Sequence, residues 1–318
     1  MIIEGFDQSK DIFSGKRIFL VCGPSFEKLS FSDYVIGLNP VRFSDFSPNP
    51  AYEDIMKGTD KFIESGCDTL LAVGGGSAMD VAKAIKYYSK SASELIAIPT
   101  TSGSGSEATR FAIIYKEGVK QSLSDDSLLP DHVILEPSVI DSVPEYTRKT
   151  TMLDALCHAI ESYWSKKATD ESKDYARRAI AEILKYKDAY LNNEYDGNKG
   201  MLAAANLAGR AINITTTTAA HAMCYKITGL YGFAHGHSAA ICLTEVWRYN
   251  AVEIPGITLN EYEELLSSLG LKFPVSSNFE ADIEVLSSSV NVDRLNNNPK
   301  PLNEMDIKHM YEKIVKKG

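Results

Sequence analysis

Four residues in three segments of the chain have the types and spacing of a metal site. Asp154 and His158 lie four residues apart in DALCHAIE, so a helix would place both on one face, about one turn apart. His221 stands in the nearly uncharged stretch TTTTAAHAMCY, and a histidine buried there needs a polar partner. His235 follows in YGFAHGHSAA, among small residues that admit a close ligand. One carboxylate and three imidazoles form a mixed oxygen and nitrogen site that suits Fe(II) or Zn(II).

The alternative is a set of core histidines that are satisfied without a metal. A lone Asp–His pair on a helix is more often a surface hydrogen bond, but the two later histidines favour the metal. We expect Gly229 and Gly232 to break the helix that carries His221, so that His235 folds back towards it.

Two glycine-rich loops each follow an apolar run. In VGGGS, which ends at Ser77, the glycines let the backbone approach a ligand closely, and Ser77 could cap the next helix, whose N-terminus would form an anion site. The second loop, PTTSGSGSE, runs from Pro99 to Glu107 and offers many hydroxyl donors. A tight turn and a flexible loop are the alternatives. Two such loops at the ends of neighbouring parallel strands favour a cofactor site, because ligands bind at that edge of a doubly wound sheet.

The elements that must position these residues divide the chain near Pro144. Before it, short apolar runs alternate with helical patterns at 52–65 and 78–88, which predicts an α/β domain with a parallel sheet over residues 1–144. The apolar runs are Arg17–Cys22, Thr69–Gly74, Leu95–Pro99, Phe111–Tyr115 and His132–Pro137, of which Phe111–Tyr115 could instead begin a small hairpin.

After Pro144 the patterns become long and helical, which predicts an all-α domain over residues 145–318. We expect a loop at 291–303, where NNNPKP stands. The predicted helices are Thr147–Ser165, Asp170–Leu191, Lys199–Ile212 and one near Asn303–Lys316.

Composition favours a small-molecule enzyme of the cytoplasm. The chain has 318 residues and a net charge of −9 without a basic stripe, which is not typical of nucleic-acid binders. Its five cysteines form no CxxC pair, which argues against a disulfide framework. No apolar run approaches the ~18 residues that a membrane span needs, and the N-terminus lacks a signal-peptide pattern.

Four segments in order, GGGSAMDVAKA, IPTTSGSGSEAT, DALCHAIESY and HAM…HGHSAA, resemble the iron-containing (group III) alcohol dehydrogenases from about residue 48 to about residue 250. The resemblance implies a dinucleotide-binding domain, a helical domain, a site in the cleft between them, and NADH or NADPH as cofactor. It also implies a homodimer. By the family pattern the metal ligands are Asp154, His158, His221 and His235. The cofactor-binding residues implied are Gly75, Gly76, Ser77, Thr100, Thr101, Ser104 and Lys120, the last directed at the nicotinamide ribose.

Two departures from the family pattern bear on the chemistry. Many members carry a second histidine, often assigned to proton transfer, where this chain has Tyr225; Tyr225, His237 or water could substitute. Many NAD-preferring members carry an aspartate where this chain has Gly23, and its absence permits NADP(H).

The resemblance implies metal-assisted hydride transfer between a small aldehyde and its alcohol. Details of the sequence look like the branch that reduces phosphonoacetaldehyde to 2-hydroxyethylphosphonate, and Arg110 and Lys226 are candidate phosphonate partners, although either could be a plain surface charge. The alternatives are a general short-chain alcohol dehydrogenase, an enzyme like glycerol-1-phosphate dehydrogenase, and a catalytically silent nucleotide-binding relative.

Overall fold

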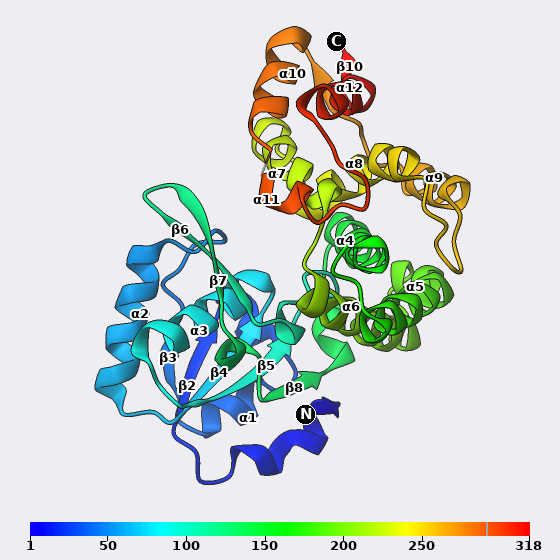
Figure 1. Cartoon of the computed structure of the whole chain (residues 1–318). Coiled ribbons are helices and arrows are strands. Elements are labelled where there is room, and N and C mark those ends of the chain that lie inside the picture. Colours follow the sequence, from blue (N-terminus) through cyan, green and yellow to red (C-terminus); the bar gives the residue numbers. More distant parts are fainter. Residues whose placement is uncertain (291) are drawn as a thin grey trace.

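A parallel sheet of six strands forms the centre of the N-terminal part of the computed structural model, which describes residues 1–290 and 292–318 (Figure 1). The strands pair in parallel throughout, as predicted. From one edge to the other they are β1 (Ile2–Glu4), β8 (His132–Leu135), β5 (Glu94–Pro99), β4 (Thr69–Gly74), β2 (Ile18–Cys22) and β3 (Val41–Phe43).

Both faces of this sheet are buried, which explains why its central strands are continuous apolar runs. In β2, Phe19 and Val21 pack in the core beneath helices α2 (Tyr52–Ser65) and α3 (Gly76–Ser89). The alternate residue Leu20 belongs to a second core, which continues into the helical part. The two predicted helices of this region are therefore confirmed, and they cover one face of the sheet.

The run that begins at Phe111 lies outside the large sheet and forms a hairpin, as the alternative expectation held. Strand β6 (Phe111–Lys116) pairs antiparallel with β7 (Val119–Ser124). Glu117 and Gly118 form the turn, both with positive φ (52° and 75°), which is the backbone of a tight two-residue hairpin loop. The edge strands β1 and β3 were not predicted, because three residues are too few to carry a pattern.

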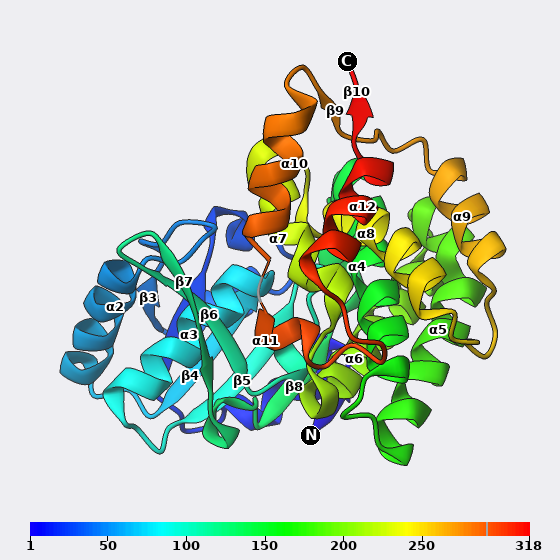
Figure 2. The ribbon, with the colours of Figure 1, turned by 45° about the horizontal axis from the view of Figure 1, so that its top comes forward.

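The C-terminal part is built from helices packed around α4, which is buried on almost every side (Figure 2). Side-chain capping boxes begin α5, α9 and α12 and explain where these helices start. The helices are α4 (Glu145–Trp164), α5 (Asp170–Leu191), α6 (Tyr195–Thr215), α7 (Ala219–Tyr231), α8 (His235–Asn250), α9 (Leu259–Ser268), α10 (Phe279–Ser288), α11 (Val292–Leu295) and α12 (Glu304–Ile314). A shorter helix, α1 (Ser32–Gly37), belongs to the N-terminal part.

Three expectations about the helical part need correction. The predicted loop at 291–303 contains α11, apart from Asn291, which lies outside the described residues. Gly229 does not break α7, because only Gly232 adopts a left-handed conformation (φ 69°) at its end. The two-residue strands β9 (Val275–Ser276) and β10 (Lys316–Lys317) pair in parallel, so this part is not wholly helical. None of the helices in the described part of the chain is long and apolar enough to cross a membrane.

Candidate metal and cofactor site

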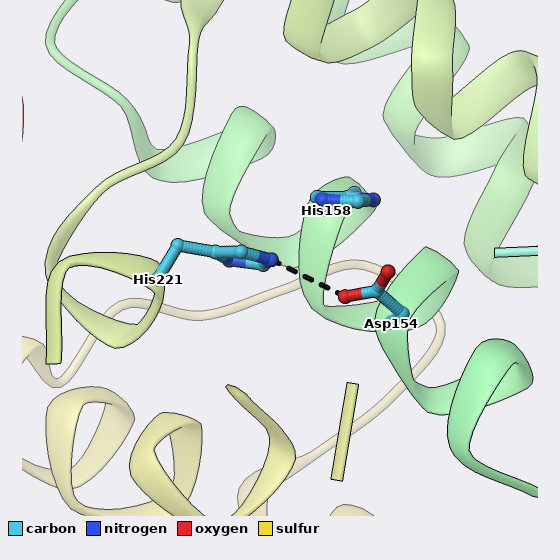
Figure 3. Close-up of side chains that lie close together, drawn as sticks. All are labelled: Asp154, His158 and His221. Carbon is cyan, nitrogen blue, oxygen red and sulfur yellow. Dashed lines mark hydrogen bonds and ion pairs between the residues drawn. The ribbon is translucent and has the colours of Figure 1, made fainter. Parts of the chain in front are cut away.

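Three predicted ligands converge in the interior of the helical part (Figure 3). Asp154 and His158 project from α4 and His221 from the first turn of α7, and their ligand atoms lie within 4.8 Å of one another. His221 Nε2 is 3.4 Å from Asp154 Oδ1, and the rings of His158 and His221 stack with centroids 4.5 Å apart. All three residues are buried. The one-turn spacing on α4 and the position of His221 therefore produce the cluster that the sequence predicts.

His235, the fourth predicted ligand, closes one side of this cluster from the start of α8. Its Nε2 atom lies 3.9 Å from Asp154 Oδ1, and its ring centroid is 5.3 Å from that of His221. The His235 side chain is 39% exposed, in contrast to the 2% of His221. The cluster is thus closed by protein on the side of α4 and exposed to solvent on the side of His235.

The three imidazoles each use their Nδ1 atom away from the centre. His158 Nδ1 donates to the Gly103 carbonyl at 3.3 Å, and His235 Nδ1 lies 3.6 Å from Cys224 Sγ. His221 Nδ1 is hydrogen-bonded to Glu161 Oε2. This pattern leaves Nε2 of every ring for a metal, which is how ligand histidines are usually oriented. The donor set therefore fits a divalent transition metal such as Fe(II) or Zn(II).

Glu161 belongs to this site, although sequence reasoning missed it. It is completely buried in α4. Its second oxygen, Oε1, accepts hydrogen bonds from the Thr218 amide (3.1 Å), the Thr218 hydroxyl (2.6 Å) and the Ala220 amide (2.9 Å). Glu161 thus fixes both the His221 ring and the start of α7. The available signal was its place three residues after His158, on the same helix face as the two ligands.

The electrostatics of the cluster suit a cation. Burial lowers the pKa of His158 to about 4. The pKa of His235 is also lowered, although its side chain is 39% exposed, because the rest of the ring is desolvated and the charges of His221 and Lys120 lie nearby. Both rings are therefore neutral near pH 7. Burial alone would also lower the pKa of His221, but the charge of Glu161 and the bond to Asp154 raise it to about 9. Burial opposes ionisation of Asp154, but the neighbouring histidines hold its pKa well below the usual range. Two buried carboxylates beside three imidazoles form a site that a divalent cation would neutralise.

Gly236 allows the close packing of α8 on α4 that brings His235 to Asp154. A Cβ atom at Gly236 would lie 2.1 Å from the Thr150 carbonyl oxygen and 2.7 Å from Asp154 Cβ. Both neighbours belong to α4, and its backbone carbonyl cannot yield without moving the helix. Small residues around His235 are therefore a packing requirement of the site.

We expect Gly236→Ala to destabilise the protein by about 1–3 kcal/mol and to weaken metal binding, because α8 must move away from α4. Gly229→Ala is the matched control. Gly229 is exposed within α7, and a Cβ atom added there would have no neighbour within 4 Å, so alanine should stabilise the helix by about 0.5–1 kcal/mol. Thermal unfolding and metal titration of both variants check this. A Gly236→Ala protein with unchanged stability and metal affinity would contradict the packing argument.

The two glycine-rich loops lie side by side at the carboxyl ends of β4 and β5. Gly74 is in register with Pro99, and the Thr100 amide donates to the Gly74 carbonyl at 2.9 Å. A Cβ at Gly75 would meet Thr101 Oγ1 at 3.3 Å, and one at Gly76 would meet Ser104 Cβ at 3.3 Å. The structure therefore brings the predicted cofactor-binding residues of both loops to one edge of the sheet, at the start of α3.

Ser77 does not cap α3 as expected. The helix begins at Gly76, two residues before the predicted start, with Gly75 at the cap position and no side-chain cap. The Ser77 hydroxyl donates instead to the Pro48 carbonyl. The amides at this helix N-terminus are consequently not covered by a serine side chain.

Lys120 and Tyr225 meet across the boundary between the two parts of the molecule. Lys120 lies on β7, and its Nζ atom is 3.3 Å from the centroid of the Tyr225 ring on α7. The same ring stacks on His235, with centroids 5.2 Å apart. Both residues that the sequence singles out are therefore beside the metal cluster.

His237 is engaged elsewhere. Tyr146 donates its hydroxyl hydrogen to His237 Nδ1 at 3.0 Å, and His237 Nε2 donates to the Lys272 carbonyl at 2.9 Å. The Tyr146 oxygen in turn accepts from the Ala234 amide at 3.1 Å. Both ring nitrogens of His237 thus hold the turn before α8 in this conformation.

The two predicted substrate cations lie outside the cluster. Arg110 pairs with Asp126 at 2.8 Å, and Lys226 is exposed on α7. Within the described part of the chain, neither contacts the four predicted ligands. Lys226 follows Tyr225 directly on the helix and is exposed, so substrate binding by either cation stays a prediction.

A parallel sheet with two glycine-rich loops, one of them bonded to a buried carboxylate and histidine cluster, is the arrangement expected of a metal-dependent, nicotinamide-linked dehydrogenase. The family model described as iron-containing alcohol dehydrogenase matches residues 5–137, and the C-terminal model of the Fe-containing alcohol dehydrogenase family matches residues 149–316. The chain belongs to the iron-containing alcohol dehydrogenase family and is an NAD-linked oxidoreductase of alcohols or aldehydes.

Similar proteins agree with this assignment. The chain is 33% identical to 1-propanol dehydrogenase PduQ of Citrobacter freundii over 253 residues, which cover 75% of this chain and 68% of the relative. The iron-containing alcohol dehydrogenase of Thermococcus thioreducens has a TM-score of 0.89 at 25% identity, covering 99% of this chain and 97% of that one. Sulfoacetaldehyde reductase from Bifidobacterium kashiwanohense, solved with NAD⁺, has a TM-score of 0.86 at 25% identity, covering 99% and 96%.

Proposed function

We propose that this protein reduces a small aldehyde with an anionic head group, using NADH or NADPH, at the Asp154 cluster. The specific candidate is phosphonoacetaldehyde, which would give 2-hydroxyethylphosphonate. The observation that supports this most is the open side of the cluster, where His235 stacks on Tyr225 and Lys120 lies over the same ring. A structural neighbour that acts on sulfoacetaldehyde, another anionic aldehyde, adds support.

Asp154, His158, His221 and His235 would hold the metal. When bound, the metal would polarise the carbonyl and the reduced nicotinamide would supply hydride. The protein's own residues position the cofactor and the aldehyde. Since the Gly103 carbonyl accepts from His158, the second glycine-rich loop is tied to the metal cluster, which would fix the cofactor relative to the aldehyde.

Proton delivery falls to Tyr225 or to water at the open side of His235. Burial raises the pKa of the Tyr225 hydroxyl well above its usual range, so it stays protonated near pH 7 and can donate a hydrogen bond to the reacting oxygen. His237 would first have to release Tyr146 or Lys272. We therefore favour Tyr225, with water as the final proton source.

A general short-chain alcohol dehydrogenase is the second candidate, and the similarity to 1-propanol dehydrogenase PduQ favours it. The intact ligand set speaks against a catalytically silent relative. The deciding experiment follows loss of NADH or NADPH absorbance by the Fe(II)-loaded protein with phosphonoacetaldehyde, succinic semialdehyde, lactaldehyde and propanal. We expect the highest kcat/KM with phosphonoacetaldehyde. If only the neutral aldehydes are turned over, the protein is a dehydrogenase but the proposal of an anionic substrate is wrong.

A further inference from the structure

We propose that Arg294 forms the subsite that binds the anionic head group of the substrate, next to Lys120, the lysine that the family resemblance directs at the nicotinamide ribose. This inference rests on the proposed function and assigns the head group to residues outside the motifs of the sequence analysis. Arg294 lies on α11, within the segment that the sequence predicts as a loop. The ligand it would take is a phosphonate, whose oxygens match the planar fork of a guanidinium.

Two cations converge on one aromatic ring beside a predicted metal ligand. Arg294 Cζ lies 5.2 Å from the centroid of the Tyr225 ring, and Lys120 Nζ lies 3.3 Å from it. The imidazole of His235 stacks on the same Tyr225 ring, with the two ring centroids 5.2 Å apart. Both cations therefore contact the ring that stacks on His235, so a head group that extends from the cluster past Tyr225 would meet them.

The two charges also act on each other. Burial lowers the pKa of Lys120 to about 8, and the charge of Arg294 contributes to that shift. A phosphonate at this position would be attracted by both charges and could accept hydrogen bonds from the guanidinium. A neutral alkyl chain would gain neither interaction.

The position of Arg294 is fixed by the segment around it. Arg294 donates to the Thr217 hydroxyl. Just beyond α11, Asn297 Nδ2 donates to the carbonyls of Thr215 (2.8 Å) and Thr217 (3.2 Å), and Asn297 Oδ1 accepts from Ser165 at 2.8 Å. Figure 1 shows α11 beside α7, and the two helices are in contact. The guanidinium is consequently held in place before a substrate arrives.

The same segment connects this subsite to the metal cluster. Thr217 contacts Arg294, and the next residue, Thr218, donates to Glu161, which in turn holds His221. A head group at Arg294 and a carbonyl at the metal would thus be held by one continuous stretch of chain. Such a stretch fixes the length of substrate that can reach both.

The test compares kcat/KM for phosphonoacetaldehyde and for propanal in wild-type, Arg294→Met, Arg294→Lys and Lys226→Met proteins, each loaded with Fe(II) and of verified metal content. We expect Arg294→Met to lower kcat/KM for phosphonoacetaldehyde by about 10- to 100-fold, the worth of a charge-assisted hydrogen bond, and that for propanal by less than about threefold. Arg294→Lys should recover part of the loss, because it keeps the charge without the fork. Lys226→Met, which removes an exposed cation from the helix that carries Tyr225, should change neither value.

Binding of 2-hydroxyethylphosphonate to the protein with NAD⁺, measured by calorimetry, should weaken in parallel. Equal losses for both aldehydes in Arg294→Met, or a larger selective loss in Lys226→Met, would overturn the subsite and leave the proposed function standing. If the wild-type enzyme shows no preference for phosphonoacetaldehyde over propanal, both the proposed anionic substrate and the proposed subsite are wrong. If Arg294→Met does not fold, Arg294→Lys is compared with the wild type instead, by the ratio of kcat/KM for phosphonoacetaldehyde to that for propanal.

Discussion

Glu161→Ala is expected to lower metal affinity by at least about 10- to 100-fold and to destabilise the metal-free protein by about 3–5 kcal/mol. The carboxylate orients His221 through Nδ1, so its loss frees the ring to turn its Nε2 away from Asp154. It also leaves the Thr218 and Ala220 amides buried without their acceptor. Competitive titration with Zn(II), and chemical unfolding of chelator-treated protein, measure the two effects separately.

Two variants control this prediction. Glu161→Gln keeps an acceptor for the amides, so it should recover much of the stability while metal affinity stays reduced. Glu145→Ala removes an exposed glutamate from the same helix, where it pairs with Lys149, and should change stability by less than about 1 kcal/mol. Metal affinity of Glu161→Ala equal to that of the wild type would show that His221 needs no carboxylate to orient it.

Lys83→Met is expected to cost about 3–5 kcal/mol and to raise KM for NADH. The Lys83 ammonium is completely buried on α3 and donates to the carbonyls of Ser106, Thr109 (2.6 Å) and Phe111 (2.8 Å). These bonds hold the second glycine-rich loop and the start of the hairpin that carries Lys120. A methionine fills the volume but removes the ammonium that these carbonyls share, and the Ser106 carbonyl keeps only the Thr109 amide and hydroxyl at 3.3 Å. The loop should therefore loosen at the proposed cofactor site.

Lys86→Met provides the comparison on the same helix. Lys86 has one carboxylate partner, Asp131 at 3.5 Å, and contacts neither glycine-rich loop. We expect a smaller loss of stability and an unchanged KM for NADH. Equal losses of cofactor affinity in the two variants would mean that Lys83 acts through the general stability of α3 and not through the loop.

The sequence contained the ligands of the site because their signals are local. Asp154 and His158 are one turn apart on a single helix. His221 and His235 stand in apolar stretches, where a buried imidazole needs a polar partner or a metal. The buried strands were likewise readable as continuous apolar runs, and the hairpin turn at Gly118 has a recognisable two-residue form.

The residues that were missed depend on contacts between distant segments. Glu161 looks like any helical glutamate until α7 brings Thr218 and His221 against it. Arg294 lies far along the chain from Tyr225, and only the folding of α11 against α7 joins them. Lys226 is the opposite case, a residue named because it adjoins Tyr225 in sequence. Helical geometry turns two adjacent side chains in different directions, so its role in substrate binding stays a prediction.

The most direct test of a metal-dependent, NAD-linked reductase at the Asp154 cluster measures bound iron and aldehyde-dependent oxidation of NADH on the same samples. Chelator-treated protein, the same protein restored with Fe(II), and Asp154→Ala would be compared. We predict that the treated protein is inactive, that activity returns in proportion to iron up to about one ion per chain, and that Asp154→Ala neither binds iron tightly nor turns over. Full turnover by metal-free protein, or wild-type activity in Asp154→Ala, would contradict the assignment of the site.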